Sequence, residues 1–358
     1  MTLRVGLIGC GFQGAVHARS IGALAGAGLV DAEVVVTHDP DRHRAEALAA
    51  LSGAAVADDP EAVVAGADAV YVCTPTGSHR RLVELVAAGG RALFCEKPLA
   101  TTLADAEAMA AAAAGIPSQV GLVLRFAPAY AALAAIVAGG SLGRPLAVVL
   151  RDDQYWPVQG QYGSTWRGEV ALAGGGTLLE HSIHDLDVLR WLLGDVVSAS
   201  GRTVELGAHP GVEDVAAATL VFASGAVATL TSVWHQVLTR PSNRRLEVLC
   251  EDGLVHVVRE WAGPLTVTTS AGTESLDCPA PAWLAALGAD ERWRGAVAAY
   301  APQARAFLTA VATGEAPAPG LEVAVAAHRL ADAVYRSAAA GGGAGQRANG
   351  CPPAAADR

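Results

Sequence analysis

The sequence predicts an α/β protein in which a doubly wound parallel sheet is followed by an α+β domain with a large, mainly antiparallel open sheet. The chain has 358 residues, more than one hydrophobic core usually organises, so two domains are expected. Short β-rich runs alternate with helical segments over residues 1–125, and closely spaced strand-like runs follow from residue 144. Alternation favours right-handed crossovers between parallel strands, whereas short turns favour antiparallel pairing.

Residues 1–125 are expected to form the first domain. Its alanine-rich helical segments include "GAVHARSIGAL" and "RHRAEALAAL". Its β-rich runs are "RVGLIG", "EVVVTHD", "AAVAD", "AVYVCTP", "ALFCEKP" and "SQVGLVLRF". Residues 126–144 then resemble a connecting helix that is closed by glycines.

Residues 126–338 are expected to form the second domain. Turn signals such as Ser224-Gly225 join several of its strand-like runs. Helices are predicted over 174–195, near 296–313 and over 321–338. Residues 339–358 are rich in Gly, Ala and Pro without periodicity, and we expect them to be disordered.

Composition excludes several classes of partner. The net charge of −10 argues against nucleic acid, which requires clustered Lys and Arg. No uninterrupted apolar run is long enough to span a membrane, and no signal peptide precedes the first strand, so a cytoplasmic location without a membrane partner is expected. The six cysteines show no CxxC spacing, which favours reduced, structural thiols.

A glycine-rich turn follows the first strand and predicts a dinucleotide site. In the GxGxxG motif, Gly9 permits a tight turn, Gly11 lets the backbone approach a pyrophosphate, and Gly14 allows close packing of helix on strand. Phe12 and Gln13 lie between these glycines, at the start of the helix. The free N–H groups there favour phosphate.

Asp39 at the end of the second strand favours NAD as the cofactor. Its carboxylate can accept hydrogen bonds from an adenosine ribose and would repel a 2′-phosphate. Arg42 and His38 lie close enough in sequence to keep NADP possible. Because Pro40 follows Asp39, a simple turn residue is the alternative interpretation.

Two further strand ends carry polar residues. Thr74 and Pro75 end one strand, with His79 just beyond, and Glu96 and Lys97 end another. Ligands of open α/β sheets bind outside these carboxyl ends. A buried Lys needs an anionic partner or a function, although one that reaches solvent needs neither. The Lys97-Pro98 bond could be cis.

The segment "GGGTLLEHSIHDLDVLRWLLGD" places titratable groups on a predicted helix. Thr177 and Glu180 have the spacing of a capping box, so the helix is expected to begin near Thr177. Glu180, His184 and Asp187 then form one stripe, in which a carboxylate raises the pKa of the imidazole for acid/base work. A solvated face, a cap or a zinc site are the alternatives. Gly174 to Gly176 allow a close approach to the backbone.

Together, these motifs resemble the glucose-fructose oxidoreductase, inositol dehydrogenase and rhizopine-catabolism family of nicotinamide-dependent oxidoreductases. The resemblance covers roughly residues 3–338 and includes "GLIGCGFQGAVHA", "VCTPTGSH", "CEKPLATTLADAEAM", "GLVLRFAPAY", "GGGTLLEHSIHDLDVLRWLLGD" and "VEDVAAATLVFASGAVATL". It implies an N-terminal Rossmann domain, a C-terminal open sheet and an active site between them.

The resemblance also implies roles for individual residues. The family's EKP lysine falls on Lys97, its acid/base histidine on His184 and the last Asp of its pattern on Asp187. The usual active-site Asp is Glu180 here, a departure that displaces the carboxylate outward. The candidate contacts to substrate are Arg125, Asp153, Tyr155, Trp166, Arg167 and His235, and an ordinary packed loop is the alternative for most of them.

These implications predict an enzyme that oxidises a secondary alcohol of a cyclic polyol or sugar and passes hydride to NAD. In this interpretation His184 exchanges the proton, Lys97 stabilises the alkoxide, Glu180 holds His184 or a substrate hydroxyl, and Asp187 supports the imidazole. No metal is required. A glycosidase that retains NAD and a non-catalytic nucleotide-binding regulator are the alternatives. The resemblance further implies a homodimer or homotetramer.

Overall fold

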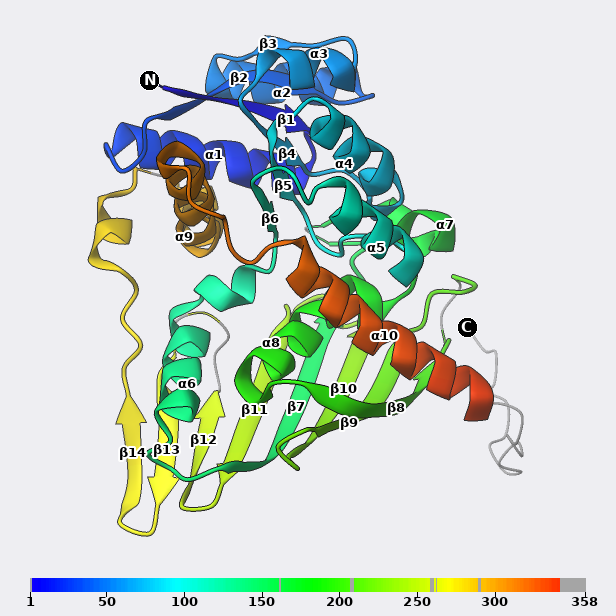
Figure 1. Cartoon of the computed structure of the whole chain (residues 1–358), viewed down its shortest axis with the longest axis vertical. Helices are drawn as coiled ribbons and strands as arrows, with labels where there is room; N and C mark the ends of the chain where they lie inside the picture. Colours follow the sequence, from blue (N-terminus) through cyan, green and yellow to red (C-terminus); the bar gives the residue numbers. More distant parts are fainter. Residues whose placement is uncertain are drawn as a thin grey trace, which may run out of the picture.

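The computed structural model describes residues 2–341 except 161, 207–208, 258–260, 262 and 289–290. It has the two sheets that the sequence predicts, one above the other in Figure 1. Residues 342–358, which include most of the predicted disordered tail, lie outside the described part. Among the described residues, no helix is long and apolar enough to cross a membrane.

The first sheet is parallel, with strand order β3-β2-β1-β4-β5-β6. Its strands are β1 (Leu3–Ile8), β2 (Ala32–His38), β3 (Ala55–Val56), β4 (Ala69–Val72), β5 (Ala92–Cys95) and β6 (Ser118–Val120). The connecting helices are α1 (Phe12–Gly26), α2 (Arg42–Ser52), α3 (Pro60–Gly66), α4 (His79–Ala88) and α5 (Leu103–Ala112). The order reverses between β1 and β4, so the predicted Rossmann topology is confirmed.

The second sheet has the order β14-β13-β12-β11-β7-β10-β9-β8 and is antiparallel except between β7 and β10. Its strands are β7 (Pro145–Tyr155), β8 (Val196–Val204), β9 (Val215–Phe222), β10 (Val227–His235), β11 (Asn243–Cys250), β12 (Gly253–Val257), β13 (Leu265–Thr269) and β14 (Gly272–Leu276). The helices around it are α6 (Pro128–Gly139), α8 (Ile183–Leu193) and α10 (Leu321–Gly341), whereas the short helix α7 (Val170–Ala173) lies against the turn at Thr76–Ser78 of the first domain. Leu186 and Leu189 of α8 pack on this sheet with Leu220 and Leu230, and α8 thus lies against its inner face.

Helix α9 (Glu291–Thr313) returns to the first sheet. Its Phe307 and Leu308 share a core with Val5 and Leu7 of β1, and α9 lies beside α1 in Figure 1. The predicted boundary between residues 125 and 126 assigns α9 to the second domain by sequence, but α9 packs in the core of the first domain. Tyr300 of α9 thereby lines a cavity between the two domains, which is described below.

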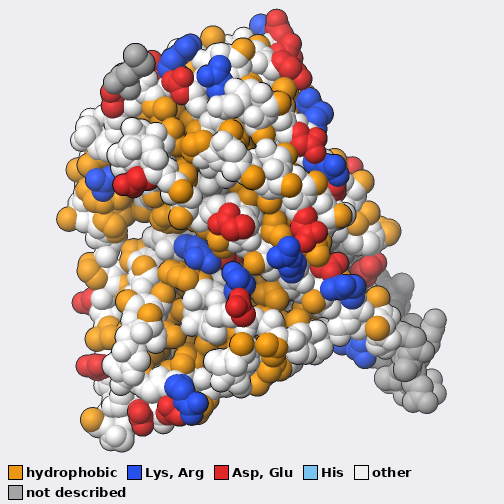
Figure 2. Space-filling view, viewed as in Figure 1, with side chains coloured by type: hydrophobic (Ala, Val, Ile, Leu, Met, Phe, Trp, Pro, Cys, Tyr) orange, Lys and Arg blue, Asp and Glu red, His pale blue; other side chains and the backbone are white. Residues whose placement is uncertain are grey.

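The described cysteines, Cys10, Cys73, Cys95, Cys250 and Cys278, are all free thiols. Burial raises the pKa of Cys73 and Cys95 well above the usual value. On the face shown in Figure 2, acidic and basic side chains are interspersed among hydrophobic ones. No group of three or more His, Cys, Asp or Glu in the described residues could hold a metal ion.

Candidate active site

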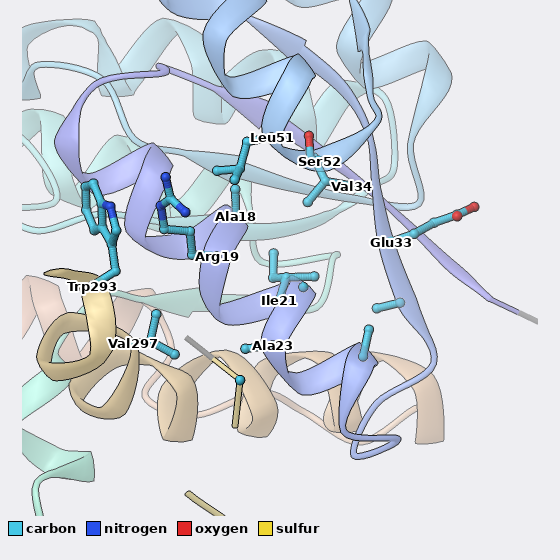
Figure 3. Close-up of a pocket in the computed structure, with 14 residues that line it drawn as sticks. Ala18, Arg19, Ile21, Ala23, Glu33, Val34, Leu51, Ser52, Trp293 and Val297 are labelled. Atoms are coloured by element: carbon cyan, nitrogen blue, oxygen red, sulfur yellow. The ribbon is translucent and has the colours of Figure 1, made fainter. Parts of the chain in front are cut away.

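A cavity of about 740 Å³ runs along the carboxyl ends of the first sheet and under the second domain. It contains thirteen of the predicted site residues: Gly9, Gly11, Phe12, Gln13, Asp39, Thr74, Pro75, Glu96, Lys97, Trp166, Arg167, Glu180 and His184. A smaller cavity of about 330 Å³ lies between α1, β2 and α9, where the guanidinium of Arg19 stacks on Trp293 at 4.6 Å (Figure 3). Only the larger cavity joins the glycine-rich turn to titratable groups of both domains, so it is the candidate active site.

The glycine-rich turn fits a dinucleotide. Gly9 has φ +95°, and a Cβ there would lie 2.6 Å from the carbonyl of Cys73. A Cβ on Gly14 would lie 2.1 Å from the carbonyl oxygen of Gly9, so Gly14 packs the helix on the turn. Gly11 has open space around it and caps α1 without a side-chain hydrogen bond. The free N–H groups of α1 are therefore accessible to a pyrophosphate.

Asp39, which follows β2, is held in place on the cavity wall by two backbone hydrogen bonds. Its Oδ2 accepts a hydrogen bond from the backbone N of Cys10 at 2.8 Å, and its Oδ1 accepts one from that of Asp41 at 2.8 Å. His38 and Arg44 line the cavity with Asp39, whereas Arg42 is exposed and pairs with Glu46. The geometry of α2 thus places Arg44 on the cavity wall in place of the predicted Arg42.

Replacing Asp39 with Ser is expected to raise the kcat/KM ratio of NADP to NAD by about tenfold or more. The change removes a negative charge that would face a 2′-phosphate, while Arg44 remains on the wall. Parallel assays with both nucleotides measure the ratio. Asp58→Ser, which removes an exposed carboxylate that pairs with Arg42 outside the cavity wall, is the matched control, and an unchanged ratio in Asp39→Ser would contradict this role.

His79 lies away from the cavity and holds the loop that carries Lys97. It is buried, with Nδ1 at 3.1 Å from the carbonyl oxygens of Pro98 and Leu99 and Nε2 at 3.0 Å from that of Thr74. Burial lowers its pKa despite these acceptors. The predicted cofactor contact is thus replaced by a link between two strand ends, and the Lys97-Pro98 bond is cis.

Glu96 faces a histidine that the sequence reading missed. His17 of α1 is fully buried, and its Nε2 lies 2.8 Å from Oε1 of Glu96. Gln13 donates to the same oxygen at 3.3 Å, and the backbone N of Lys97 donates to Oε2 at 3.1 Å. Burial alone would raise the pKa of Glu96, but the hydrogen bond and charge of His17, with Lys97, hold it below its usual value.

Lys97 reaches across to the second domain. Its Nζ donates a hydrogen bond to the backbone oxygen of Glu180 at 2.6 Å. Burial lowers the pKa of Lys97 to about 8; the charge of Glu180 opposes the shift, and that of Arg167 adds to it. The amine is thus a donor whose proton is exchangeable near neutral pH.

The segment before α8 differs from the predicted capping box. Residues Thr177–His181 form a π-helical turn, and α8 begins only at Ile183. The carboxylate of Glu213 accepts hydrogen bonds from the backbone N of Gly176 at 2.6 Å and of Leu178 at 2.9 Å. Glu213 therefore takes the place of the predicted cap partner. The side chain of Glu180 instead extends toward the first domain.

Other segments of the chain fill the space beside the three glycines before this turn. An added Cβ would lie 2.5 Å from Cα of Thr101 at Gly174, 2.4 Å from the hydroxyl of Tyr335 at Gly175 and 2.0 Å from the carbonyl oxygen of Glu213 at Gly176. The predicted close approach is therefore made by neighbouring segments of the chain.

Gly176→Ala is expected to destabilise the protein by about 1–3 kcal/mol or more, as overpacking does. Gly22→Ala is the matched control, because it lies inside α1 with nothing within 4 Å of the added Cβ. In a helix that change stabilises by roughly 0.5–1 kcal/mol. Thermal unfolding of both variants measures the difference, and equal midpoints would refute the packing role of Gly176.

Glu180 bridges the domains through its side chain. It is 1% exposed, and its Oε1 accepts a hydrogen bond from the hydroxyl of Thr76 at 2.8 Å, while Oε2 accepts one from Nε of Arg167 at 2.9 Å. Both carboxylate oxygens are thus engaged away from His184, contrary to the expected Glu180–His184 pair. The side chain of Glu180 thus reaches Thr76 of the first domain.

His184 is 6% exposed and lines the cavity. Burial lowers its pKa well below the usual value, and the charges of Lys97, Arg244 and His181 add to the effect. Its Nδ1 makes no hydrogen bond within the described part of the chain. The ring is therefore neutral at physiological pH, opposite to the predicted rise in pKa.

Asp187 does not support His184. Both of its oxygens accept hydrogen bonds from Arg125, each at 2.8 Å, and Arg125 also stacks on Trp191. Arg125 is absent from the cavity wall. The pair instead ties the segment that links the domains to α8.

A buried ionic cluster, which no sequence motif indicated, lies beside His184. Arg244 donates from Nε to Asp185 at 2.8 Å and from Nη2 to Asp152 at 3.1 Å. His181 lies 3.0 Å from Asp152. Burial raises the pKa of Asp185 to about 7, while Arg244 opposes the shift and Asp152 adds to it. Arg244 and His181 also line the cavity.

The remaining predicted substrate contacts lie on strands β7 and β10, on the sheet face that points away from the cavity. Asp153, Tyr155 and His235 are not among the residues that line the cavity, whereas Gln154 and Trp234 are. Asp153 pairs with Arg240 and lies 3.5 Å from His235. Side chains alternate between the two faces of a strand, so the inward positions are the neighbours of those predicted.

Comparisons with known proteins agree with this architecture. Residues 3–122 match the oxidoreductase family with an NAD-binding Rossmann fold, and residues 130–256 match the GFO/IDH/MocA C-terminal domain.

The chain is 30% identical to inositol 2-dehydrogenase of Rhizobium meliloti (strain 1021), covering 95% of this chain and 98% of the relative. It is 32% identical to inositol 2-dehydrogenase 2 of Paenarthrobacter aurescens (strain TC1), covering 94% and 96%. The crystal structure of GenD2 from gentamicin A biosynthesis in complex with NAD is similar, with a TM-score of 0.78, 26% identity and 95% of both chains covered. Because these matches span both domains, the chain belongs to the GFO/IDH/MocA family of oxidoreductases, whose N-terminal domain is an NAD-binding Rossmann fold.

Proposed function

We propose that this enzyme interconverts a secondary alcohol and a ketone on a cyclic polyol or sugar, with NAD as the redox partner. The observation that carries the proposal is the meeting of Lys97 and His184 in one cavity whose other end is the glycine-rich turn. The relatives named inositol 2-dehydrogenase support the same class of substrate.

Residues of the first domain would bind the pyrophosphate and the adenosine ribose of NAD. The N–H groups at the start of α1 would bind the pyrophosphate, and the carboxylate of Asp39 would accept hydrogen bonds from the adenosine ribose. Thr74, Pro75 and Glu96 line the path between them and Lys97. NAD supplies the hydride acceptor when it is bound.

His184 is suited to take the hydroxyl proton during oxidation, because its low pKa keeps an imidazole nitrogen unprotonated. Lys97 is suited to donate a hydrogen bond to the oxygen as negative charge develops there. Glu180 acts as a positioning residue, since its backbone oxygen holds Nζ of Lys97 and its carboxylate holds Arg167. In the reduction direction the proton moves from His184 to the ketone oxygen.

The roles of these two groups predict a pH dependence. Lys97, with a pKa of about 8, is protonated below that pH and loses its charge above it. We therefore expect kcat/KM to fall as the pH rises through about 8, while His184 stays neutral on both sides. Lys97→Arg, which remains protonated, is expected to lose this alkaline limb. An identical limb in both proteins would contradict the role of Lys97.

We also propose that the enzyme is a homodimer or homotetramer, as its family resemblance implies. The outer face of the second sheet carries exposed apolar residues, including Val149 of β7 and Val227 of β10, and such faces commonly mark protein interfaces. The mass in solution, measured by light scattering, tests this.

The experiment that tests the function follows NADH formation with NAD against a panel of inositols, aldoses and amino sugars. NADH formed with at least one member is the expected result. Release of a leaving group from a glycoside without net NADH would instead identify a glycosidase. Tight NAD binding with neither reaction would indicate a regulator.

A further inference from the structure

Arg167 presents unused hydrogen-bond donors to the cavity. Its Nε is bound to Glu180 at 2.9 Å, and its guanidinium lies 4.5 Å from the centre of the Trp166 ring. These contacts fix one edge and one face of the group. The two terminal amino nitrogens make no hydrogen bond to any described residue, although the side chain is only 17% exposed. The free edge is a preformed fork of N–H donors.

Glu180, the carboxylate that pairs with Arg167, already has other hydrogen-bond partners. Each oxygen of Glu180 already accepts a hydrogen bond, from Thr76 or Arg167, and the side chain has no exposed surface, so it offers little to a substrate hydroxyl. Lys97 converges on the same residue through the backbone oxygen of Glu180. Two cations with donors to spare therefore flank Glu180, one from each domain.

Arg244, a third cation that lines the cavity, is neutralised by carboxylates outside the cavity. Arg244 is paired with Asp185 and Asp152, both of which are fully buried. Its charge is thus balanced by protein groups that do not line the cavity. Arg167 differs, because its single carboxylate partner must also balance the nearby Lys97.

We propose that the substrate is a polyhydroxy carboxylate, a sugar acid, whose carboxylate binds the free edge of Arg167 while its reacting hydroxyl lies at Lys97 and His184. This assignment rests on the proposed function and specifies the substrate class of the same site. A carboxylate offers two oxygens in the plane and spacing of a guanidinium edge, which a neutral hydroxyl does not.

The test uses a matched pair of compounds, D-glucuronate and D-glucose, in the NADH assay with the full chain. We expect kcat/KM to be at least about tenfold higher for the acid, as charge-assisted hydrogen bonds are roughly twice as strong as neutral ones. Arg167→Gln is expected to abolish this preference, and Arg167→Lys to retain part of it through its charge. NAD affinity is expected to stay unchanged. Arg190→Gln, an arginine on the surface of α8 paired with Asp195, is the control.

Three results would overturn the assignment while leaving the oxidoreductase reaction intact: equal or better use of D-glucose by the wild type, a preference for the acid that survives in both Arg167 variants, or equal use of D-glucose 6-phosphate. The last would show a site for anions in general. Absence of NADH with every compound, despite NAD binding, would overturn the proposed function and this assignment together.

Discussion

Lys97→Ala is expected to lower kcat by about a hundredfold or more and to leave the affinity for NAD nearly unchanged. The variant loses the ammonium group that meets the developing alkoxide, and removal of one such donor costs about 10²–10³ in other enzymes. Steady-state kinetics with the best substrate of the panel gives kcat, and fluorescence titration gives the Kd of NAD.

The loss of Lys97 also leaves the backbone oxygen of Glu180 without its donor, so thermal unfolding must accompany the kinetics. Lys97→Met keeps the aliphatic stem and is the matched variant. Both proteins are expected to unfold within a few degrees of the wild type. A folded variant with turnover within about tenfold of wild type would refute the assignment of Lys97.

His184→Ala is expected to reduce turnover by about a hundredfold or more, the usual size of a general acid/base contribution. The deleted ring is the neutral proton acceptor on the cavity wall, and no hydrogen bond to its Nδ1 within the described chain is broken. Added imidazole is expected to restore part of the activity. His256→Ala, on β12 near Glu247, is the control and should behave as wild type.

The order of motifs along the chain was enough to predict the architecture. Alternating β-rich and alanine-rich segments predicted the parallel sheet, and the GxGxxG turn predicted which of its edges binds the nucleotide. Gly9 and Gly14 have local reasons to be glycine, a positive φ and a contact between helix and turn. Such short-range constraints are visible in a sequence.

The errors have a common physical origin in contacts between distant segments. Thr177 and Glu180 have the spacing of a capping box, but Glu213 binds the backbone there and Glu180 turns to Thr76. Likewise, Asp187 has the right spacing to reach His184 on a helix, yet Arg125 binds it. Local spacing cannot reveal a partner that lies tens of residues away.

Strand register caused the other differences. Asp153 and His235 were predicted to reach the substrate, whereas Gln154 and Trp234, one position along, line the cavity. A shift of one residue moves a side chain to the opposite face of a sheet. Arg42 and Arg44 are two residues apart on α2, about half a helical turn, so only Arg44 faces the cavity.

The most direct test of the account is the transfer of label from the carbinol carbon. The polyol or sugar acid that reduces NAD is prepared with deuterium at that carbon, and the nucleotide product is weighed by mass spectrometry. Direct hydride transfer predicts NADH that carries one deuterium, formed by the wild type and about a hundredfold more slowly by the Lys97 and His184 variants. Unlabelled NADH, or equal rates in all three proteins, would contradict direct hydride transfer at the site formed by these two residues.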